Sequence, residues 1–427
     1  MVWDRLAEGE FLHARRVRAW LTIAAAATVG MIGFGLITAK GLHDVTGRPL
    51  GSDFISFWAA ARVAIAGPVA AAWDVVRHGA EQAAVFGPAD SFAAFFYPPV
   101  TLLVLWPLGY LPYLAALAVW LGVTIVACRQ ALVGWAGPWA AGGLGLLAFL
   151  AFPAVFSVLG HGQNSFLTTA LFAGGGALVA RRPVLAGLVF GCLVYKPHMA
   201  VVLPLALAAA GQWRTVVAMA VSALGLVGLS VVVFGAEPWI AFFELSRAVR
   251  ATLEQGLVEP GKMVSIHRAA HMLGASVEAA TWVHGVAVAA VLAALTMAVR
   301  RHREPDAAIA AAAAATLLVS PFMLDYDEML LAVPMAWMVR RGLATGFLNW
   351  ERVGLLATFV LPGVARPLAM GLGVPVAPLV TVLFVGLVLR RVWADGRQGA
   401  EVRDDAEGAR VETGRAGRPA AALPEAA

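Results

Sequence analysis

Long apolar segments separated by short polar or basic stretches occupy nearly the whole chain of 427 residues. Many of them, beginning with residues 19–39, approach the roughly 20 apolar residues that cross a bilayer as one α-helix. Further spans are predicted over residues 138–157, 166–180, 215–234, 281–299, 306–324, 329–339, 352–365 and 375–389. The pattern predicts an all-α, polytopic transmembrane helical bundle of about 10–12 membrane helices, some of them short or re-entrant.

Prolines interrupt two of the apolar segments, residues 98–129 and residues 183–212. Proline breaks the hydrogen-bond ladder of a helix, and inside a membrane the freed backbone groups must be covered by protein or water. We expect a broken or partly re-entrant helix in the first segment. The second begins and ends at basic residues, which predicts two short helices that meet at a tip near Lys196 and His198.

Basic clusters at the ends of the spans set the predicted orientation, because positive residues stay on the cytoplasmic side of a membrane. These clusters lie at residues 15–18, 181–182, 214, 300–303, 340–341 and 390–391, and all of them can face the cytoplasm at once. The first apolar segment is longer than the roughly 7–15 residues of a signal-peptide core, which favours an uncleaved anchor. We therefore expect a multi-pass protein of the inner (plasma) membrane with both termini in the cytoplasm.

This orientation divides the chain into a cytoplasmic N-terminus, a transmembrane domain and a disordered cytoplasmic tail, over residues 1–18, 19–393 and 394–427. Two large external loops, residues 40–96 and 235–280, interrupt the transmembrane domain. Residues 54–66 of the first loop place aromatic and small residues at helical spacing, which predicts an amphipathic helix on the membrane surface. The polar motifs of the chain then fall together on the external side.

Composition agrees with a membrane protein, because 60% of the residues are hydrophobic and only 13% are charged, against about 25% charged in soluble domains. The sequence pI of about 9.6 does not indicate nucleic-acid binding, since the arginines cluster at span ends. Cys128 and Cys192 both fall in apolar segments, so free buried thiols are expected rather than a disulfide.

Asp53 is the acid that most needs an explanation, because Phe54, Ile55, Phe57 and Trp58 follow it and pull the loop toward the membrane interface. An acid in a loop can simply be solvated. A carboxylate shielded from bulk water can instead have a raised pKa and act as a base. We therefore treat Asp53 as the candidate catalytic residue.

Lys196 is costly in the middle of an apolar hairpin and must pair with an anion or reach an aqueous cavity. Pro197 breaks the helix beside it, and His198 follows. A lipid phosphate at the membrane surface is a natural partner for such a cation. The alternative is a lysine whose ammonium group extends to the interface.

The remaining polar motifs each have a plain structural alternative. Tyr97 could line a substrate site or mark an interfacial helix start. The turn around His161, Gln163 and Asn164 could bind sugar hydroxyls or cap the next helix. The acids of the 325–327 segment could bind a metal ion or favour a helix N-terminus, and residues two apart do not share a helix face.

Five short motifs occur in order along the chain: Gly51-Ser52-Asp53-Phe54, Phe96-Tyr97-Pro98-Pro99, Gly162-Gln163-Asn164, Lys196-Pro197, and Ser320-Pro321 with Asp325-Tyr326-Asp327. Over roughly residues 15–390 this succession resembles glycosyltransferase family 87. The family comprises integral membrane enzymes of the GT-C type, among them mannosyltransferases that depend on polyprenol-phosphate-mannose.

The resemblance implies inverting transfer of mannose or a similar hexose from a polyprenyl phosphate to an extracytoplasmic lipid or glycan, without a nucleotide-sugar, cofactor or metal. Asp53 sits where the family has its general base. Some relatives carry His where this chain has acids and Tyr326, and an acid would repel a phosphate. The donor phosphate is therefore expected at Lys196, His198, Arg62 and Tyr326. The other substrate contacts are expected at Tyr97, His161, Gln163, Asn164, Asp325, Asp327 and His267.

A transporter or flippase for a lipid or polar solute, with Lys196 in its translocation path, is the alternative function, because broken helices and a buried lysine also suit transport. Such a protein should show two related halves and polar groups on both faces of the bundle. The sequence has no convincing internal repeat, and its polar motifs gather on one face. A third alternative is a non-catalytic export or scaffold protein, in which Asp53 faces no cavity.

Overall fold

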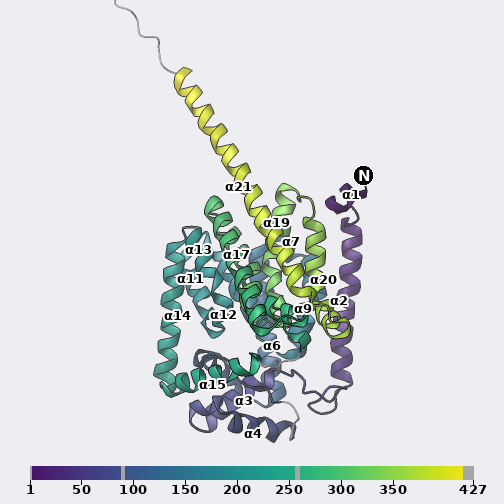
Figure 1. The fold of residues 1–427 in the computed structure, drawn as a ribbon, viewed down its shortest axis with the longest axis vertical. Coiled ribbons are helices and arrows are strands. Elements are labelled where there is room, and N and C mark those ends of the chain that lie inside the picture. The colour runs from purple at the N-terminus through teal and green to yellow at the C-terminus, as the bar shows by residue number, and fades with distance from the viewer. Residues whose placement is uncertain (1, 88–91, 255–259, 417–427) are drawn as a thin grey trace, which may run out of the picture.

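The computed structural model describes residues 2–87, 92–254 and 260–416, and within them the chain is an all-α bundle with only isolated β-bridges (Figure 1). Helices long and apolar enough to cross a membrane are α2 (Ala14–Ile37), α6 (Tyr113–Ala136), α14 (Trp213–Phe234), α17 (Val277–His302), α20 (Glu351–Leu372) and the segment Val376–Gly396 of α21 (Val376–Ala416). The predicted polytopic transmembrane bundle is confirmed.

Shorter apolar helices complete the bundle: η2 (Pro99–Thr101), α5 (Leu102–Leu105), η3 (Trp106–Tyr110), α10 (Ser165–Val179), α11 (Pro183–Gly191), η4 (Cys192–Tyr195), α12 (Pro197–Ala200), α13 (Val202–Ala209) and α18 (Pro305–Val319). Both predicted interruptions are present. The short helices η2 to η3 end at Tyr110 before α6 begins, and η4 and α12 meet at Lys196.

One predicted span, residues 138–157, is wrong as a single straight helix. The chain forms α7 (Pro138–Ala141), α8 (Gly143–Ala151) and α9 (Pro153–His161), and α8 and α9 are bent by 58° at their junction. Pro153 explains the break, because its ring fixes φ and it lacks the N–H that would continue the helix.

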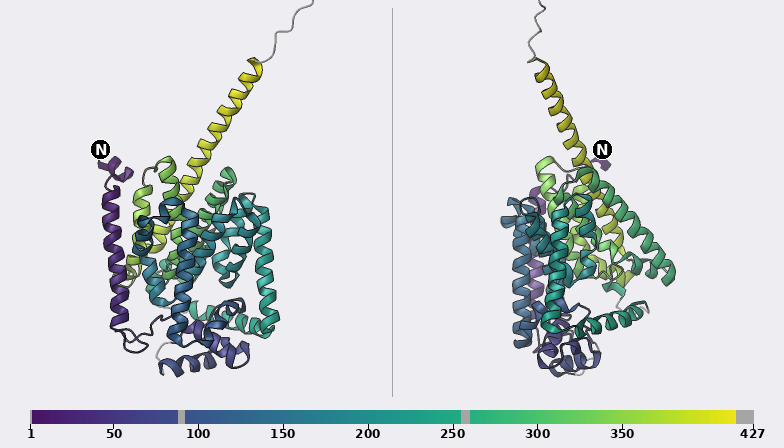
Figure 2. Two further views of the ribbon diagram at one scale, coloured as in Figure 1. Left: turned by 180° about the vertical axis from the view of Figure 1, so that it is seen from behind. Right: turned by 90° about the vertical axis from the view of Figure 1, so that its left-hand side faces the viewer.

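The remaining elements lie mostly at the two ends of the bundle: α1 (Val2–Glu8), α3 (Phe54–Ala66), η1 (Val69–Trp73), α4 (Val75–Phe86), α15 (Glu237–Glu254), η5 (Pro260–Lys262), α16 (Ile266–Met272), η6 (Asp325–Leu331) and α19 (Ala332–Thr345). The N-terminus and the outer end of α21 lie at one end, and α3, α4 and α15 form a layer across the other (Figures 1 and 2).

Helix α3 forms where an amphipathic surface helix was expected, but it is not on the surface. Most of its residues are buried, with Phe54 and Phe57 almost fully so. Its aromatic side chains pack against Trp73, Phe95 and Tyr113 of the neighbouring loop elements and α6. The small residues between the aromatics let α4, η1 and η3 cover the helix from other sides.

Helix α18 lies at the centre of the bundle, and every residue from Ala307 to Leu318 is buried. A helix that is apolar on all sides is a buried one. Its run of alanines lets neighbouring helices approach closely, as small residues do in membrane bundles.

The segment 394–416, predicted to be part of a disordered tail, continues as helix α21, and residues 417–427 lie outside the described residues. Ala and Arg are strong helix formers, and together they outnumber the glycines of this segment. Low hydrophobicity therefore did not exclude a helix that extends from a span.

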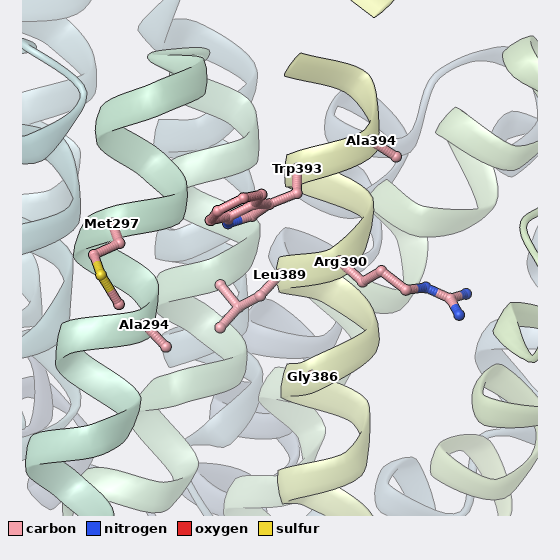
Figure 3. A pocket seen from close by; sticks show the side chains of 7 residues that line it. All are labelled: Ala294, Met297, Gly386, Leu389, Arg390, Trp393 and Ala394. Carbon is pink, nitrogen blue, oxygen red and sulfur yellow. The ribbon is translucent and has the colours of Figure 1, made fainter. Parts of the chain in front are cut away.

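An open groove of about 700 Å³ lies between α17 and α21 (Figure 3). Met297, Leu389 and Trp393 line it, while the guanidinium of Arg390 points away. None of the polar motif residues lines this groove. Its apolar walls on two membrane helices suit contact with hydrocarbon and not with a phosphate or sugar.

A buried ion-pair network joins the last three helices. Arg391 in α21 pairs with Glu351 at the start of α20, with 2.9 Å between Nη1 and Oε2. Asp395 lies 3.2 Å from Nε of Arg391 and 2.7 Å from Nε of Arg341 in α19. The side chains of Arg391 and Glu351 are at most 2% exposed, so neither charge has water as an alternative partner.

Replacement of Arg391 by Ala is therefore expected to destabilise the protein by about 3–5 kcal/mol, because it leaves the buried Glu351 without its cation, whereas Asp395 keeps Arg341. Thermal unfolding of the detergent-purified protein measures this loss. The control is Arg300→Ala, since Arg300 is exposed. Equal unfolding temperatures for the two variants would contradict the structural role of the network.

Candidate active site

Two glycines bring the start of α3 against the end of α9. Gly162 ends α9 in the left-handed conformation, with φ of +67°, and donates its N–H to the carbonyls near the helix end. A Cβ at Gly162 would lie 2.6 Å from Cβ of Phe54 and 3.3 Å from Cα of Gly51. This close approach lets the N–H of Asp53 donate to the carbonyl of His161 at 2.9 Å.

Asp53 lies at the centre of a polar cluster. Lys262 of η5 donates to both carboxylate oxygens, at 3.0 Å to Oδ1 and 2.8 Å to Oδ2. Gln163 donates from Nε2 to Oδ2 at 3.1 Å, and Ser52 lies 3.4 Å from Oδ1. The carboxylate is thus held by a cation and an amide from two different loops.

The pKa of Asp53 is lower than its ordinary value, contrary to the expected rise. Burial raises the pKa, but the charge of Lys262, a contribution from His161 and the hydrogen bonds from Lys262 and Gln163 together outweigh it. The sequence argument considered shielding from water alone. The cation that reverses the sign comes from η5, far from Asp53 in the chain.

His161 and Asp325 extend the cluster on the side away from Gln163. Nδ1 of His161 lies 3.1 Å from the hydroxyl of Ser52 and 3.7 Å from Oδ1 of Asp53, while Nε2 lies 4.0 Å from Oδ2 of Asp325. Asp325 accepts from Arg366 of α20 at 3.2 Å. The outer part of the cluster therefore alternates acids with cations and one imidazole.

Lys196 and Asp327 form a second, deeper ion pair. Nζ of Lys196 lies 2.5 Å from Oδ1 of Asp327 and 3.2 Å from Oδ1 of Asn164. Ser165 also donates to Asp327, at 2.9 Å. The side chains of Lys196 and Asp327 are 3% and 1% exposed, against 19% and 20% for Lys262 and Asp53. The two ion pairs thus differ mainly in their exposure to solvent.

The ring of Tyr326 lies beside both lysines. Nζ of Lys196 is 5.3 Å from the ring centroid, and Nζ of Lys262 is 5.7 Å from it. Tyr97 joins the cluster from the other side, where its hydroxyl donates to Oε1 of Gln163 at 3.3 Å. Most of the residues proposed from sequence are therefore brought together at one end of the bundle.

Three of the proposed residues lie elsewhere or make no direct contact with the cluster. Arg62 pairs with Glu81 of α4 at 3.1 Å and lies over Trp58. His267 lies near Thr281 of α17, 3.3 Å from its hydroxyl. His198 follows Lys196 on α12 and is half-buried.

The sequence argument missed Lys262 and Arg366. A signal for Lys262 was present, because the chain has only three lysines among 31 basic residues: Lys40, Lys196 and Lys262. The arginines cluster at the ends of the spans, so a lysine in a loop that was predicted to be external was already unusual. No sequence pattern indicated a role for Arg366. It lies within an apolar helix, and its contacts with other segments depend on the fold.

The two acids of the 325–327 segment face different partners, as residues two apart on a helical turn should. Asp325 meets Arg366 and the N–H of Tyr326, whereas Asp327 meets Lys196 and Ser165. In the described part of the chain no three His, Cys, Asp or Glu side chains converge as a metal site would require. The arrangement can instead hold an anion beside its lysines and accept a proton at Asp53.

Gly162→Ala tests whether the glycine contact positions the site. A Cβ there is strained by the positive φ and meets Phe54, at an expected cost of about 1–3 kcal/mol in stability and a loss of activity. Gly160→Ala is a matched control, because a Cβ at Gly160 meets nothing within 4 Å. Activity and thermal unfolding of both variants measure the effect, and a Gly162→Ala protein equal to the control would contradict it.

Comparison with known proteins identifies the family of the chain. The chain matches Glycosyltransferase family 87 over residues 95–321, which is more than half of its length. The match includes Tyr97, Gln163, Lys196 and Lys262, while Asp53 and the 325–327 segment lie outside it. Searches of curated proteins and of solved structures each gave no significant match. The protein is a multi-pass membrane glycosyltransferase, and the chain belongs to glycosyltransferase family 87.

Proposed function

We propose that the protein is an inverting glycosyltransferase that moves mannose or a similar hexose from a polyprenyl phosphate to a hydroxyl of a lipid or glycan. Asp53 is the general base of this proposal. The observation that supports this role most is solvent exposure. Among the three aspartates of the cluster, the side chain of Asp53 is 20% exposed, against 6% for Asp325 and 1% for Asp327. A base must reach the acceptor hydroxyl, and Asp53 is the acid best placed to do so.

In the proposed reaction the acceptor hydroxyl gives its proton to Asp53 as its oxygen attacks the anomeric carbon. The bond from that carbon to the phosphate oxygen breaks, and the polyprenyl phosphate leaves with the electron pair. Gln163 holds Oδ2 of Asp53 and is itself fixed by Tyr97, so the carboxylate keeps its direction. Negative charge that develops on the phosphate is stabilised by nearby cations and hydrogen-bond donors.

Lys196 and Tyr326 are proposed to support the donor phosphate from the deep side of the site. Lys196 is neutralised by Asp327, so its contribution is to the potential of the site and to the position of Tyr326. His198 follows Lys196 and supports the same region. Arg62 lies over Trp58 of α3 and pairs with Glu81, so it would have to leave that pair to contribute.

Contacts to the sugar and acceptor hydroxyls are proposed for the remaining polar groups of the cluster: Tyr97, His161, Gln163, Asn164, Asp325 and Asp327. His267 stays a weaker prediction, because its ring lies beside Thr281 of α17 and not beside the acids of the cluster. No observation favours the transporter or flippase function over a glycosyltransferase, which the family membership supports.

An extracytoplasmic site in the plasma membrane is proposed from the positive-inside rule. The basic clusters belong to the end of the bundle where α1 and the outer end of α21 lie, and α3, with Asp53 at its start, lies at the opposite end (Figure 1). Polyprenyl phosphates are lipids, so a site at the end of a membrane bundle gives a donor direct access from the bilayer. The same location suits a lipid or glycan acceptor.

Asp53→Asn is expected to lower the rate of sugar transfer by about 10²–10⁴-fold, the usual contribution of a general base. The change keeps the shape of the side chain while it removes the proton acceptor. Transfer of radiolabelled sugar from polyprenyl-phosphate donors to membrane-extracted acceptors measures the rate. Glu244→Gln on the exposed face of α15 is the control for a lost carboxylate, and a fully active Asp53→Asn protein would remove the base from the proposal.

Lys196→Ala is expected to lower stability by about 3–5 kcal/mol, because it leaves Asp327 buried and unpaired. It should also weaken donor binding. The double variant Lys196→Met with Asp327→Leu removes both charges and should restore most of the stability. If donor affinity also returns in the double variant, Lys196 is structural and does not support the phosphate.

A further inference from the structure

We propose that Lys262 is shared between Asp53 and the donor phosphate, and that the arriving phosphate draws Lys262 away from Asp53 and so makes that carboxylate a competent base. The inference rests on the proposed function, which assigns the base but says nothing of how it is activated. Lys262 touches the reacting carboxylate through both of its oxygens. Its role is therefore to couple donor binding to the reactivity of Asp53.

The first step of the argument concerns the pair as it stands. A carboxylate that accepts two hydrogen bonds from an ammonium group is a weak base, because a proton must compete with that cation. General-base catalysis works best when the base has a pKa near the working pH. Asp53 in its observed contacts with Lys262 and Gln163 is thus held ionised but unreactive, and the cation must move before the acid can accept a proton.

The second step is a choice among the cations of the cluster. Each lies against an acid: Lys196 against Asp327, Arg366 against Asp325, and Lys262 against Asp53. A phosphate reaches the accessible cations first, and the side chain of Lys262 is 19% exposed against 3% for Lys196. Arg366 is as accessible as Lys262, at 22%, but its departure would free Asp325 and not the proposed base.

The third step is that Lys262 has a fixed backbone and a movable side chain. The N–H of Val264 donates to the carbonyl of Met323 at 2.9 Å, and Met263 forms a β-bridge with Leu324. A Cβ on Gly261 would lie 2.4 Å from Met370 of α20, so the preceding backbone is tightly packed. The flexible four-carbon stem of a lysine lets the ammonium group swing from such an anchor.

The charged and titratable groups that face Asp53 come from several elements and all bear on the test. They are His161 of α9, Lys262 of η5, Tyr326 of η6, and the phenols of Tyr97 and Tyr113. Asp325, Asp327 and Arg366 interact in turn with His161 or with these tyrosines. Loss of Lys262 from Asp53 raises the pKa of that carboxyl. Donor binding should therefore be coupled to proton uptake at mildly acidic pH, where the bound state begins to hold a proton that the free state does not.

The experiment is calorimetric titration of the purified full-length protein with farnesyl methyl phosphate, a phosphodiester whose own charge stays constant over the pH range used. Titrations in buffers of different ionisation enthalpy give the protons taken up on binding. The wild-type protein should take up protons, and Asp53→Asn should bind without this uptake. Lys262→Met should bind about 10- to 100-fold more weakly, as expected for a lost charge-assisted hydrogen bond, and also without uptake.

Three further variants make the outcome specific. Lys262→Arg keeps the cation and should retain proton uptake, which a purely structural role for Lys262 does not require. Lys40→Met changes the exposed third lysine and should behave as wild type. The double variant Asp53→Asn with Lys262→Met removes both charges together. It replaces the single lysine variant in the binding measurement if that variant does not fold.

Failure of this inference and failure of the proposed function give different results. If Lys262→Met binds the phosphodiester as tightly as wild type with the same proton uptake, Lys262 is not shared, and the proposed function stands. Uptake that persists in Asp53→Asn assigns the proton to another group, such as His161, and also overturns the inference. If the wild-type protein binds no phosphodiester, the polyprenyl-phosphate donor itself is wrong.

Discussion

The free-energy cost of an unpaired charge in surroundings with little water governs the polar end of this bundle. A buried ion without a partner costs several kcal/mol, so the three aspartates of the cluster each lie against a cation. Asp327 has Lys196, Asp325 has Arg366 and Asp53 has Lys262. In the proposed function a phosphate enters a cluster whose aspartates already have cations, so donor binding would redistribute these pairs.

The fold supplies these partners from segments far apart in the chain, and breaks in its helices make that possible. Gly162 ends α9 beside Asp53, Lys196 lies at the break between η4 and α12, and η6 interrupts the path from α18 to α19. A continuous helix satisfies its own backbone and points its side chains outward in a regular spiral. Where the helix stops, several side chains of one short turn can face the same point.

The sequence predicted the membrane helices well, because hydrophobicity over a window of residues is a local property that needs no knowledge of neighbours in space. It also predicted that Asp53, Gln163, Lys196 and Tyr97 would gather at one end, since the basic flanks fix which turns share a side. The pKa of Asp53 was predicted with the wrong sign. Its value depends on Lys262, which lies 209 residues further along the chain, and no local pattern specifies that contact.

Tyr326 gives this site a property that a charged or imidazole side chain would not. Its ring face attracts both lysines without neutralising either, and it has no charge to repel a phosphate. An acid at this position would compete with Asp53 for Lys262, and a cation would repel the lysine from its place. With a phenol ring 5.7 Å from its ammonium group, Lys262 keeps a favourable neighbour whether it contacts Asp53 or an anion, so its movement between the two costs less than it would across an apolar wall.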